Sequence, residues 1–508
     1  MRILYYDIDT LRADHLGCYG YCRDTSPSID RIASEGVRFE NCYVSDAPCL
    51  PSRASTWTGR FGIHSGVVGH GGTAADLRLV GPERGFRHPP ARNSWIAALR
   101  QAGLRPVSFS PFAERHSAWW FYHGWLEMHN TGKGGMEIAP EVVPAALRWL
   151  DQHAKEDNWF LHVNVWDPHT PYRTPLDFGD PFKGQPFDPW LTDERIQEHF
   201  KSYGSHSAQD LADIGPCDPS RWPRLPRQIT CLDDFATWIN GYDTGIRYAD
   251  DHLGMLLAEL ERQGVLDDTA ILISSDHGEN QGELNVYGDH QTADHITSRV
   301  PCIFRWPGLP AGRVDAALHY QTDVAATLIE LLGGQVPPLW DGRSFAPALR
   351  EKDSRSLFCE APVGHSVEKT PGVFFPTGRD TLVVSNCAWS CMRTIRWGDW
   401  MLLRTYHDGL KSLPPKMLFN VADDPHMTRD LSNDRPNLVN EGLARLHEWQ
   451  AEMMSTSESE VDPLWNVIRE GGPFHTRGRL HRYCEHLRAT GRSHHADALI
   501  ARHGHWMA

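Results

Sequence analysis

The chain has 508 residues, of which 40% are hydrophobic and 23% charged, an ordinary composition for a folded protein with one large and one smaller domain. Its formal net charge of −15 argues against a nucleic-acid partner, which would require a basic face. No apolar stretch is long enough for a transmembrane helix, and the acidic Asp7 comes too early for a secretory signal. Eleven cysteines without a paired framework indicate reduced thiols. We therefore expect a cytoplasmic protein that binds neither nucleic acid nor membrane.

The first predicted element is a short apolar strand at residues 3–9. Asp7 and Asp9 are two residues apart, so they lie on one face of this strand, and Asp9 stands at its C-terminal end. Open α/β sheets bind their ligands at the C-terminal ends of the strands. Asp9 is therefore a candidate ligand-binding residue, and the alternative is an ordinary helix cap or turn.

A cysteine, a proline and an arginine follow in the run from Cys49 to Arg60, which reads CLPSRASTWTGR. Pro51 suits the first turn of a helix, and Arg53 lies about one turn after Cys49. The free backbone N–H groups of such a turn can bind an anion. A potential nucleophile, a cation and a helix N-terminus are thus predicted to meet at one point. The alternative is a buried cysteine beside an unrelated arginine.

This run closely resembles the signature of the sulfatase family, C-x-P-S-R followed by T-G-R. In that family the cysteine is oxidised after translation to formylglycine, and the hydrate of its aldehyde is the nucleophile. The resemblance implies that Cys49 is the catalytic nucleophile in this modified form, and that a formylglycine-generating enzyme is a partner in maturation. It also implies that Arg53 steadies the formylglycine and the developing charge.

Two further segments resemble the metal site of the same family. Asp9 stands at the position of the strand-end metal ligand, and the run SSDHGE carries Asp276 and His277 in the family's S-D-H-G-E pattern. The resemblance implies that these three residues and Cys49 hold one divalent metal. Carboxylate ligands favour Ca²⁺, and the imidazole leaves Mn²⁺ as an alternative. Thr10 stands where the family often has a second Asp, so one ligand is missing or replaced.

Two histidines and one arginine are predicted to approach the substrate from loops. His70 lies in a Gly-rich loop, where related phosphonate and sulfate ester hydrolases carry an Asn that faces the substrate. Arg115 and His116 lie near the place of the family's G-K-x-H, which this chain lacks. We predict Arg115 and His70 as substrate-binding residues and His116 as catalytic, and the alternative for His70 is a surface position.

The run DPHTPY at 167–172 resembles the family's D-P-H-x-P-Y, whose His contacts the sulfate or protonates the leaving oxygen. A His with an ordinary pKa of about 6.5 can act as a general acid, so His169 is predicted to be catalytic. The run YGDHQT at 287–292 resembles W-G-K-H-T, with Asp289 in place of the sulfate-holding Lys. Because a carboxylate would repel sulfate, either Asp289 points elsewhere or His290 takes over substrate binding.

The remaining patterns predict alternating helices and strands, which is typical of an α/β fold. The expected elements are a helix at 93–103, a strand at 104–110, a helix at 139–154, a strand at 159–165, a helix at 233–263, a strand at 269–275, a strand from 299 and a helix at 321–332. The resemblance implies an alkaline-phosphatase-like α/β/α sandwich with a large, mostly parallel sheet. Residues 173–230 read as an excursion over the surface.

A different rhythm follows in the last part of the chain. Strand-like runs at 380–385, 391–396 and 400–405, followed by a helix at 436–453, predict a small antiparallel sheet with one helix. We place the catalytic domain at 1–370 and a C-terminal subdomain at 371–508. Its tail from about 460 has no recognised counterpart, and it is expected to pack on a partner subunit or to form part of the pocket rim. A homo-oligomer is compatible with either arrangement.

The predicted function is hydrolysis of a sulfate monoester, either a sulfated carbohydrate or an aryl sulfate. The nearest alternative is a phosphonate monoester or phosphodiester hydrolase with the same formylglycine and metal. An alternative of another class is a non-catalytic protein that keeps Cys49 unmodified and binds sulfated glycans. The residues alone leave the sulfated substrate unidentified.

Overall fold

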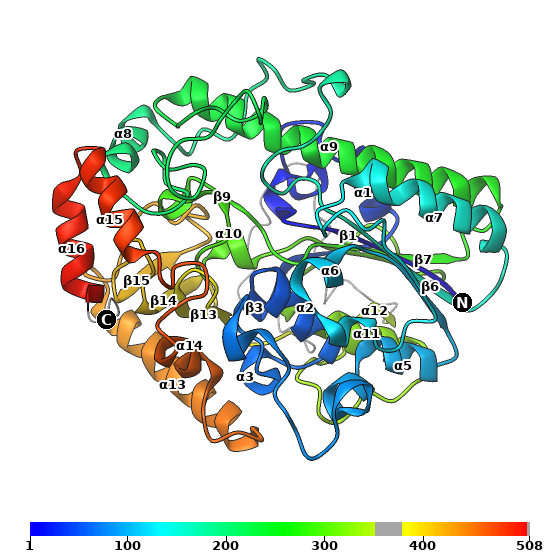
Figure 1. Ribbon diagram of the computed structural model, residues 1–508. Helices are drawn as coiled ribbons and strands as arrows, with labels where there is room; N and C mark the ends of the chain where they lie inside the picture. Colours follow the sequence, from blue (N-terminus) through cyan, green and yellow to red (C-terminus); the bar gives the residue numbers. More distant parts are fainter. Residues whose placement is uncertain (351–377, 505–508) are drawn as a thin grey trace.

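The computed structural model describes residues 1–350 and 378–504, and a single large sheet lies at its centre between two layers of helices (Figure 1). Its eight strands are, in spatial order, β11 (Arg313–Tyr320), β2 (Val37–Tyr43), β10 (Cys302–Arg305), β7 (Thr269–Ser274), β1 (Arg2–Ile8), β6 (Trp159–Val165), β4 (Arg105–Phe109) and β5 (Glu127–His129). All neighbouring strands are parallel except β10, which runs antiparallel to β7 and β2. The predicted α/β class with a large, mostly parallel sheet is confirmed.

Helices cover both faces of this sheet. One face carries α1 (Pro27–Ser34), α7 (Ala139–His153) and α9 (Leu232–Arg262), and the other carries α2 (Cys49–Thr58), α5 (Trp95–Gln101) and α11 (Thr322–Leu331). Side chains of β1 alternate between the two cores, because successive strand residues point to opposite faces. Leu4 and Tyr6 join the core under α9, whereas Ile3 and Tyr5 join the core under α2. This double burial explains why the central strands read as continuous apolar runs.

The predicted small antiparallel sheet is present, and it is joined to the large domain next to Cys49. Its strands are β15 (Lys416–Asn420), β14 (Trp400–His407), β13 (Cys391–Trp397), β12 (Thr381–Asn386) and β3 (Asp46–Ala47). The strand β3 pairs in parallel with β12, so that Asp46 lies opposite Ser385. Helix α13 (Pro436–Thr456) packs its apolar face on this sheet. The expected domain boundary at 370 lies outside the described residues.

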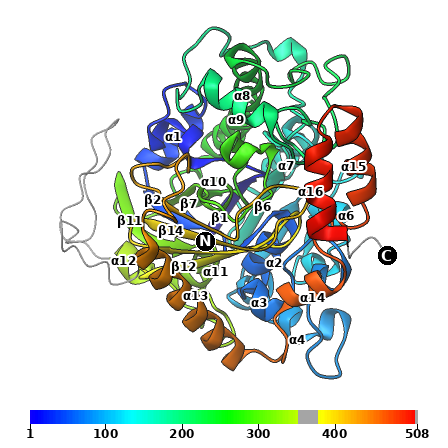
Figure 2. The same ribbon diagram turned by 90° about the vertical axis from the view of Figure 1, so that its left-hand side faces the viewer.

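Two segments differ from their sequence-based descriptions. Residues 173–230 contain helix α8 (Asp193–Lys201), and Ile196, Leu211 and Ile229 are buried in the main core. The expectation of an excursion confined to the surface is therefore wrong. The tail forms α14 (Pro463–Arg469), α15 (Leu480–Ala489) and α16 (Ser493–His503), which lie along one side of the molecule (Figure 2). Leu464 and Val467 of α14 pack with Val68 and Ala74, which flank His70, whereas α15 and α16 pack with Tyr203 and Leu410.

The remaining described elements are short. They are α3 (Gly62–Ser65), α4 (Pro89–Arg92), α6 (Phe112–His116), β8 (Asn280–Gln281), β9 (Tyr287–Asp289), α10 (His295–Ser298) and α12 (Ala346–Arg350), with several single 3-10 turns. Within 1–350 and 378–504, no helix has the length and apolar composition needed to cross a membrane. Ten cysteines fall in these ranges, and all are free thiols.

Candidate active site

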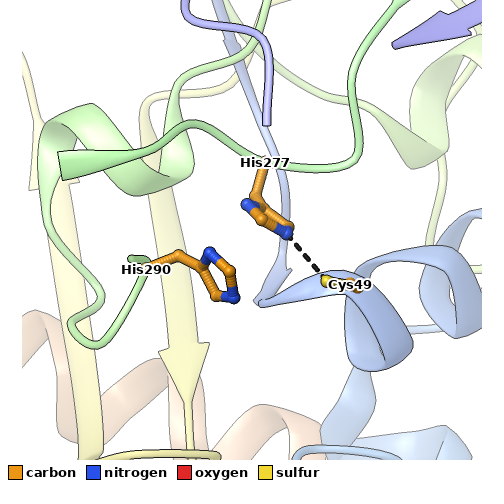
Figure 3. Close-up of side chains that lie close together, drawn as sticks. All are labelled: Cys49, His277 and His290. Atoms are coloured by element: carbon orange, nitrogen blue, oxygen red, sulfur yellow. Dashed lines mark hydrogen bonds between the residues drawn. The ribbon is translucent and has the colours of Figure 1, made fainter. Parts of the chain in front are cut away.

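The site lies where strands of the large sheet end and helix α2 begins. Asp9 follows β1 and Asp276 follows β7, so the parallel pairing of the two strands brings both carboxylates to one edge. Cys49 is the first residue of α2 and is fully buried. Its Sγ, one oxygen of each carboxylate and a ring nitrogen of His277 all lie within 4.8 Å of one another. Figure 3 shows His277 pointing at Cys49, with His290 beside them; the Cys49 Sγ–His277 Nε2 distance is 3.1 Å.

The donor set around Cys49 fits a divalent cation. His277 Nδ1 lies 2.8 Å from the carbonyl oxygen of Gly278, and because a carbonyl only accepts, Nδ1 carries the proton. The Nε2 lone pair is then directed at the cluster, as a metal ligand requires. Asp9 Oδ1 is buried and has no hydrogen-bond partner among the described residues. Two carboxylates and one imidazole suit Ca²⁺ or Mn²⁺.

Arg53 contacts both carboxylates of this cluster. Its guanidinium is 2% exposed, forms an ion pair with Asp7, and lies 3.3 Å from Asp9 and 3.2 Å from Asp276. Asp7 is also 3.2 Å from His162 Nε2. Burial raises the pKa of Asp7, but Arg53 and His162 outweigh it and hold the pKa below its ordinary value. Asp7 therefore fixes the position of Arg53 through their ion pair. The sequence analysis placed Asp7 on the same strand face as Asp9 but did not predict this role.

Burial, and then the charge of Asp276, raise the pKa of Asp9 well above its ordinary value. Burial, and then Asp9, also raise the pKa of the Cys49 thiol. A thiol in this state stays protonated at neutral pH and is a poor nucleophile, since only the thiolate attacks efficiently. The surroundings of Cys49 therefore do not favour cysteine chemistry by the unmodified side chain.

His290 lies next to His277 in the cluster, and His169 lies next to His290. The rings of His290 and His277 have centroids 4.1 Å apart, and His169 meets His290 edge-on at 5.4 Å. His169 Nδ1 lies 2.6 Å from Thr170 O, which leaves Nε2 unprotonated, buried and without a partner among the described residues. Burial, followed by Arg115, lowers the pKa of His169 well below 6.5. The expectation of an ordinary pKa is therefore wrong, and the ring is neutral before substrate binds.

The loop residues His70 and His116 also reach the nucleophile. Ring nitrogens of both lie within 4.8 Å of Cys49 Sγ and of each other. The guanidinium of Arg115 lies over Trp166 at 3.8 Å, and its Nη1 is buried without a hydrogen-bond partner in the described part of the chain. Buried donors without partners are unfavourable unless a ligand completes them, so Arg115 indicates an anion-binding position. The surface alternative for His70 is not supported.

Asp289 is turned toward the protein. Its Oδ2 lies 3.0 Å from His206 Nε2, and its Oδ1 accepts a hydrogen bond of 2.7 Å from the backbone N–H of His290. Both carboxylate oxygens of Asp289 thus have partners within the protein. Of the two alternatives left open by the sequence, the structure supports the one in which Asp289 points away from the sulfate. His206 lies in the 173–230 segment, where no pattern in the sequence marked it. His475 of the tail, which contacts His70 at 2.8 Å, was missed for the same reason.

Comparison with known proteins shows the family and the fold of the chain. The sequence model of the family described as Sulfatase matches residues 3–334. The multifunctional alkaline phosphatase superfamily protein PehA of Trinickia caryophylli is 24% identical, over 80% of this chain and 86% of its own.

Two solved structures share the fold. BT4656 in complex with its substrate D-glucosamine-2-N,6-O-disulfate has a TM-score of 0.67 at 18% identity, covering 90% of this chain and 99% of its own. The phosphonate monoester hydrolase of Agrobacterium radiobacter has a TM-score of 0.64 at 18% identity, covering 89% of this chain and 96% of its own. At such identities these likenesses establish the fold alone.

Proposed function

The chain belongs to the sulfatase family, and on that premise we propose that it hydrolyses a sulfate monoester with Cys49 matured to formylglycine. The observation that carries the proposal is the convergence of Cys49 with Asp9, Asp276 and His277 within 4.8 Å at the end of the sheet. A cysteine with only a packing role would not explain why Asp9 Oδ1, buried beside it, has no hydrogen-bond partner among the described residues.

Two groups complete the proposed site. In maturation by a formylglycine-generating enzyme, dioxygen and an external thiol reductant convert the Cys49 side chain to an aldehyde; the Cβ–Sγ bond breaks, the sulfur leaves as hydrogen sulfide, and dioxygen is reduced to water. Addition of water to the aldehyde gives a hydrate that supplies a nucleophilic hydroxyl at this position. Asp9, Asp276, His277 and residue 49 would hold one divalent cation, Ca²⁺ or Mn²⁺, and this cation would act as a Lewis acid on the sulfate.

The chain's own side chains then divide the remaining work. Arg53, held by Asp7, keeps a positive charge beneath the nucleophile and stabilises charge that develops there. Arg115 Nη1, which has no hydrogen-bond partner within 1–350 and 378–504, offers a donor to the sulfate oxygens. His169 is neutral, and its buried Nε2 has no hydrogen-bond partner among the described residues, so it takes up a proton from solvent when the monoanionic sulfate ester binds and gives this proton to the leaving oxygen. His116, which has a ring nitrogen within 4.8 Å of Cys49 Sγ, accepts the proton of the attacking hydroxyl as a general base.

A sulfated carbohydrate is the proposed substrate class. BT4656, which shares the fold, binds a sulfated glucosamine. This chain lacks the lysines that hold the sulfate in the family, and Asp289, which replaces one of them, is paired with His206. Binding of the sulfate therefore depends on arginine and imidazole donors.

Hydrolysis of a phosphonate monoester is the second candidate. It is supported by the shared fold of the phosphonate monoester hydrolase of Agrobacterium radiobacter and by the same lack of sulfate-holding lysines. An aryl phosphonate monoester carries a carbon substituent on phosphorus where an aryl sulfate carries an oxygen on sulfur, and both are monoanions with an aryl-oxide leaving group, so the same nucleophile can attack either ester.

The test is aerobic co-expression with a formylglycine-generating enzyme, followed by intact-mass analysis of the Cys49 peptide and rates on matched aryl sulfate and aryl phosphonate esters. We expect the mass of formylglycine and the higher kcat/KM on the sulfate. A higher kcat/KM on the phosphonate would establish the second candidate. An unmodified Cys49 after expression in the native host, with tight binding of sulfated glycans and no turnover, would establish the binding protein.

A further inference from the structure

The C-terminal tail lies beyond the stretch matched by the family, yet it reaches the nucleophile through a pair of histidines. His475, in the turn between α14 and α15, places Nε2 2.8 Å from Nδ1 of His70. The other nitrogen of His70, Nε2, is buried and has no hydrogen-bond partner among the described residues. A ring nitrogen of His70 lies within 4.8 Å of Cys49 Sγ.

The tail is fitted closely to the loop that carries His70. Thr73 donates its backbone N–H to Glu470 at 3.1 Å, which fixes the loop to the end of α14. A Cβ added at Gly71 would come within 2.0 Å of the Phe474 ring, and one at Gly72 within 2.0 Å of Glu470. At Gly71 the added atom would overlap an aromatic ring, and Gly72 has a φ of +72°, which glycine adopts without strain, so both glycines suit the close approach of the loop to the tail.

His475 itself is held on three sides. Its backbone N–H donates to Ala388 O at 3.1 Å, and its ring stacks on Trp389 with centroids 4.6 Å apart. The third contact is His70 itself. Burial lowers the pKa of His475 to about 4, so its ring is neutral at physiological pH. A neutral ring in a fixed position selects the tautomer of the partner to which it is hydrogen-bonded.

A nitrogen–nitrogen contact of this length requires one nitrogen to carry the proton and the other to accept it. If His70 Nδ1 donated, its Nε2 would present a lone pair to the site and repel the oxygens of an anionic ester. If His475 Nε2 donates, His70 Nε2 carries a proton and becomes a donor. The second arrangement is the one that an anionic substrate stabilises.

We propose that His475 is a positioning residue, which donates its Nε2–H to His70 Nδ1 and thereby directs the Nε2–H of His70 at the anionic group of the substrate. The tail thus completes the active site of the same chain. The inference rests on the proposed function, since it assumes that an oxyanion occupies the space beside Cys49.

The test measures binding of inorganic sulfate and inorganic phosphate to the full chain by isothermal titration calorimetry, in parallel with turnover of the aryl esters. We expect His475→Leu to weaken anion binding about tenfold, the value of one hydrogen bond to a charged group. His475→Gln, whose amide can donate from a similar position, should remain within about threefold of the wild type. His481→Leu, at an exposed tail histidine, is the matched control and should change nothing.

A double-mutant cycle separates positioning from a general effect on the fold. His70→Ala should lose as much affinity as His475→Leu, and the double variant should lose no more than either. If His475→Leu does not fold, His475→Asn, which is polar but too short to reach His70, takes its place. Unchanged binding in His475→Leu, additive losses, or no anion binding by the wild type would overturn the inference. A wild type that binds sulfate and hydrolyses neither ester would overturn the proposed function alone.

Discussion

Replacing the nucleophile should abolish activity while leaving the fold in place, and Cys49→Ala is the substitution that shows it. Cys49 is fully buried, so the variant loses one heavy atom from a packed site, which costs about 1 kcal/mol including the cavity. It also loses the 3.1 Å contact with His277, worth about 1 kcal/mol more. A loss of about 2 kcal/mol lowers Tm by only a few degrees in a protein of this size.

The effect on catalysis is far larger. Without the side chain that carries the nucleophile, kcat on an aryl sulfate should fall by about 10⁴-fold or more, as expected when covalent catalysis is lost. The assay compares kcat of Cys49→Ala with that of the mature wild type, and Tm with that of wild type that retains the Cys49 thiol. Cys484→Ala is the matched control, because it removes another buried thiol, 2% exposed, from the tail helix α15. It should show a similar fall in Tm with full activity.

Full activity in Cys49→Ala would refute the mechanism outright. A variant that loses activity only because it unfolds would show a fall in Tm well beyond that of Cys484→Ala, and the calculation from the contacts of Cys49 would then be wrong.

Three further predictions concern the charged groups of the structure. Chelation with EDTA should reduce kcat at least tenfold, with recovery on addition of Ca²⁺ or Mn²⁺ measured in the same assay. Arg53→Lys should lower kcat about 10²-fold, because an ammonium cannot reproduce the forked contacts that Arg53 makes with Asp7 and the other carboxylates. Burial lowers the pKa of His426, but Asp188 and Glu283 raise it to a net value of about 9. The stabilisation by His426 is therefore complete below about pH 6.5 and is lost as the pH rises through 9, so the Tm difference between wild type and His426→Gln should shrink between pH 6 and pH 10.

Each of these has a contrary outcome. Activity unaffected by prolonged chelation, with no metal found by elemental analysis, would remove the cation from the proposal. Wild-type kcat in Arg53→Lys would show that a single point charge suffices beneath residue 49. A Tm difference for His426→Gln that grows with pH would mean that the ring is neutral in the folded protein.

Local patterns in the sequence predicted five of the eight strands of the large sheet, β1, β4, β6, β7 and β10, but did not predict β2, β5 or β11. The predicted strands at 159–165 and 269–275 match the bounds of β6 and β7 to within one residue. Strands buried on both faces form continuous apolar runs, and such runs are easy to recognise in a sequence. The long helix at 233–263 was equally clear from its period. The 173–230 segment was misjudged, since its few buried residues are spaced without regular period.

The sequence by itself determined the family and the fold class, and it predicted the candidate positions Cys49, Arg53, Asp276 and His277, because each of these residues lies in a short run whose spacing is set by one turn or one strand end. Only the tertiary structure decided what surrounds them: that Asp7 anchors Arg53, that Asp289 turns to His206, and that the tail delivers His475 to His70. These contacts join residues as much as 405 positions apart. No local spacing encodes such pairs, since they form only when separate packed surfaces of the fold are brought together.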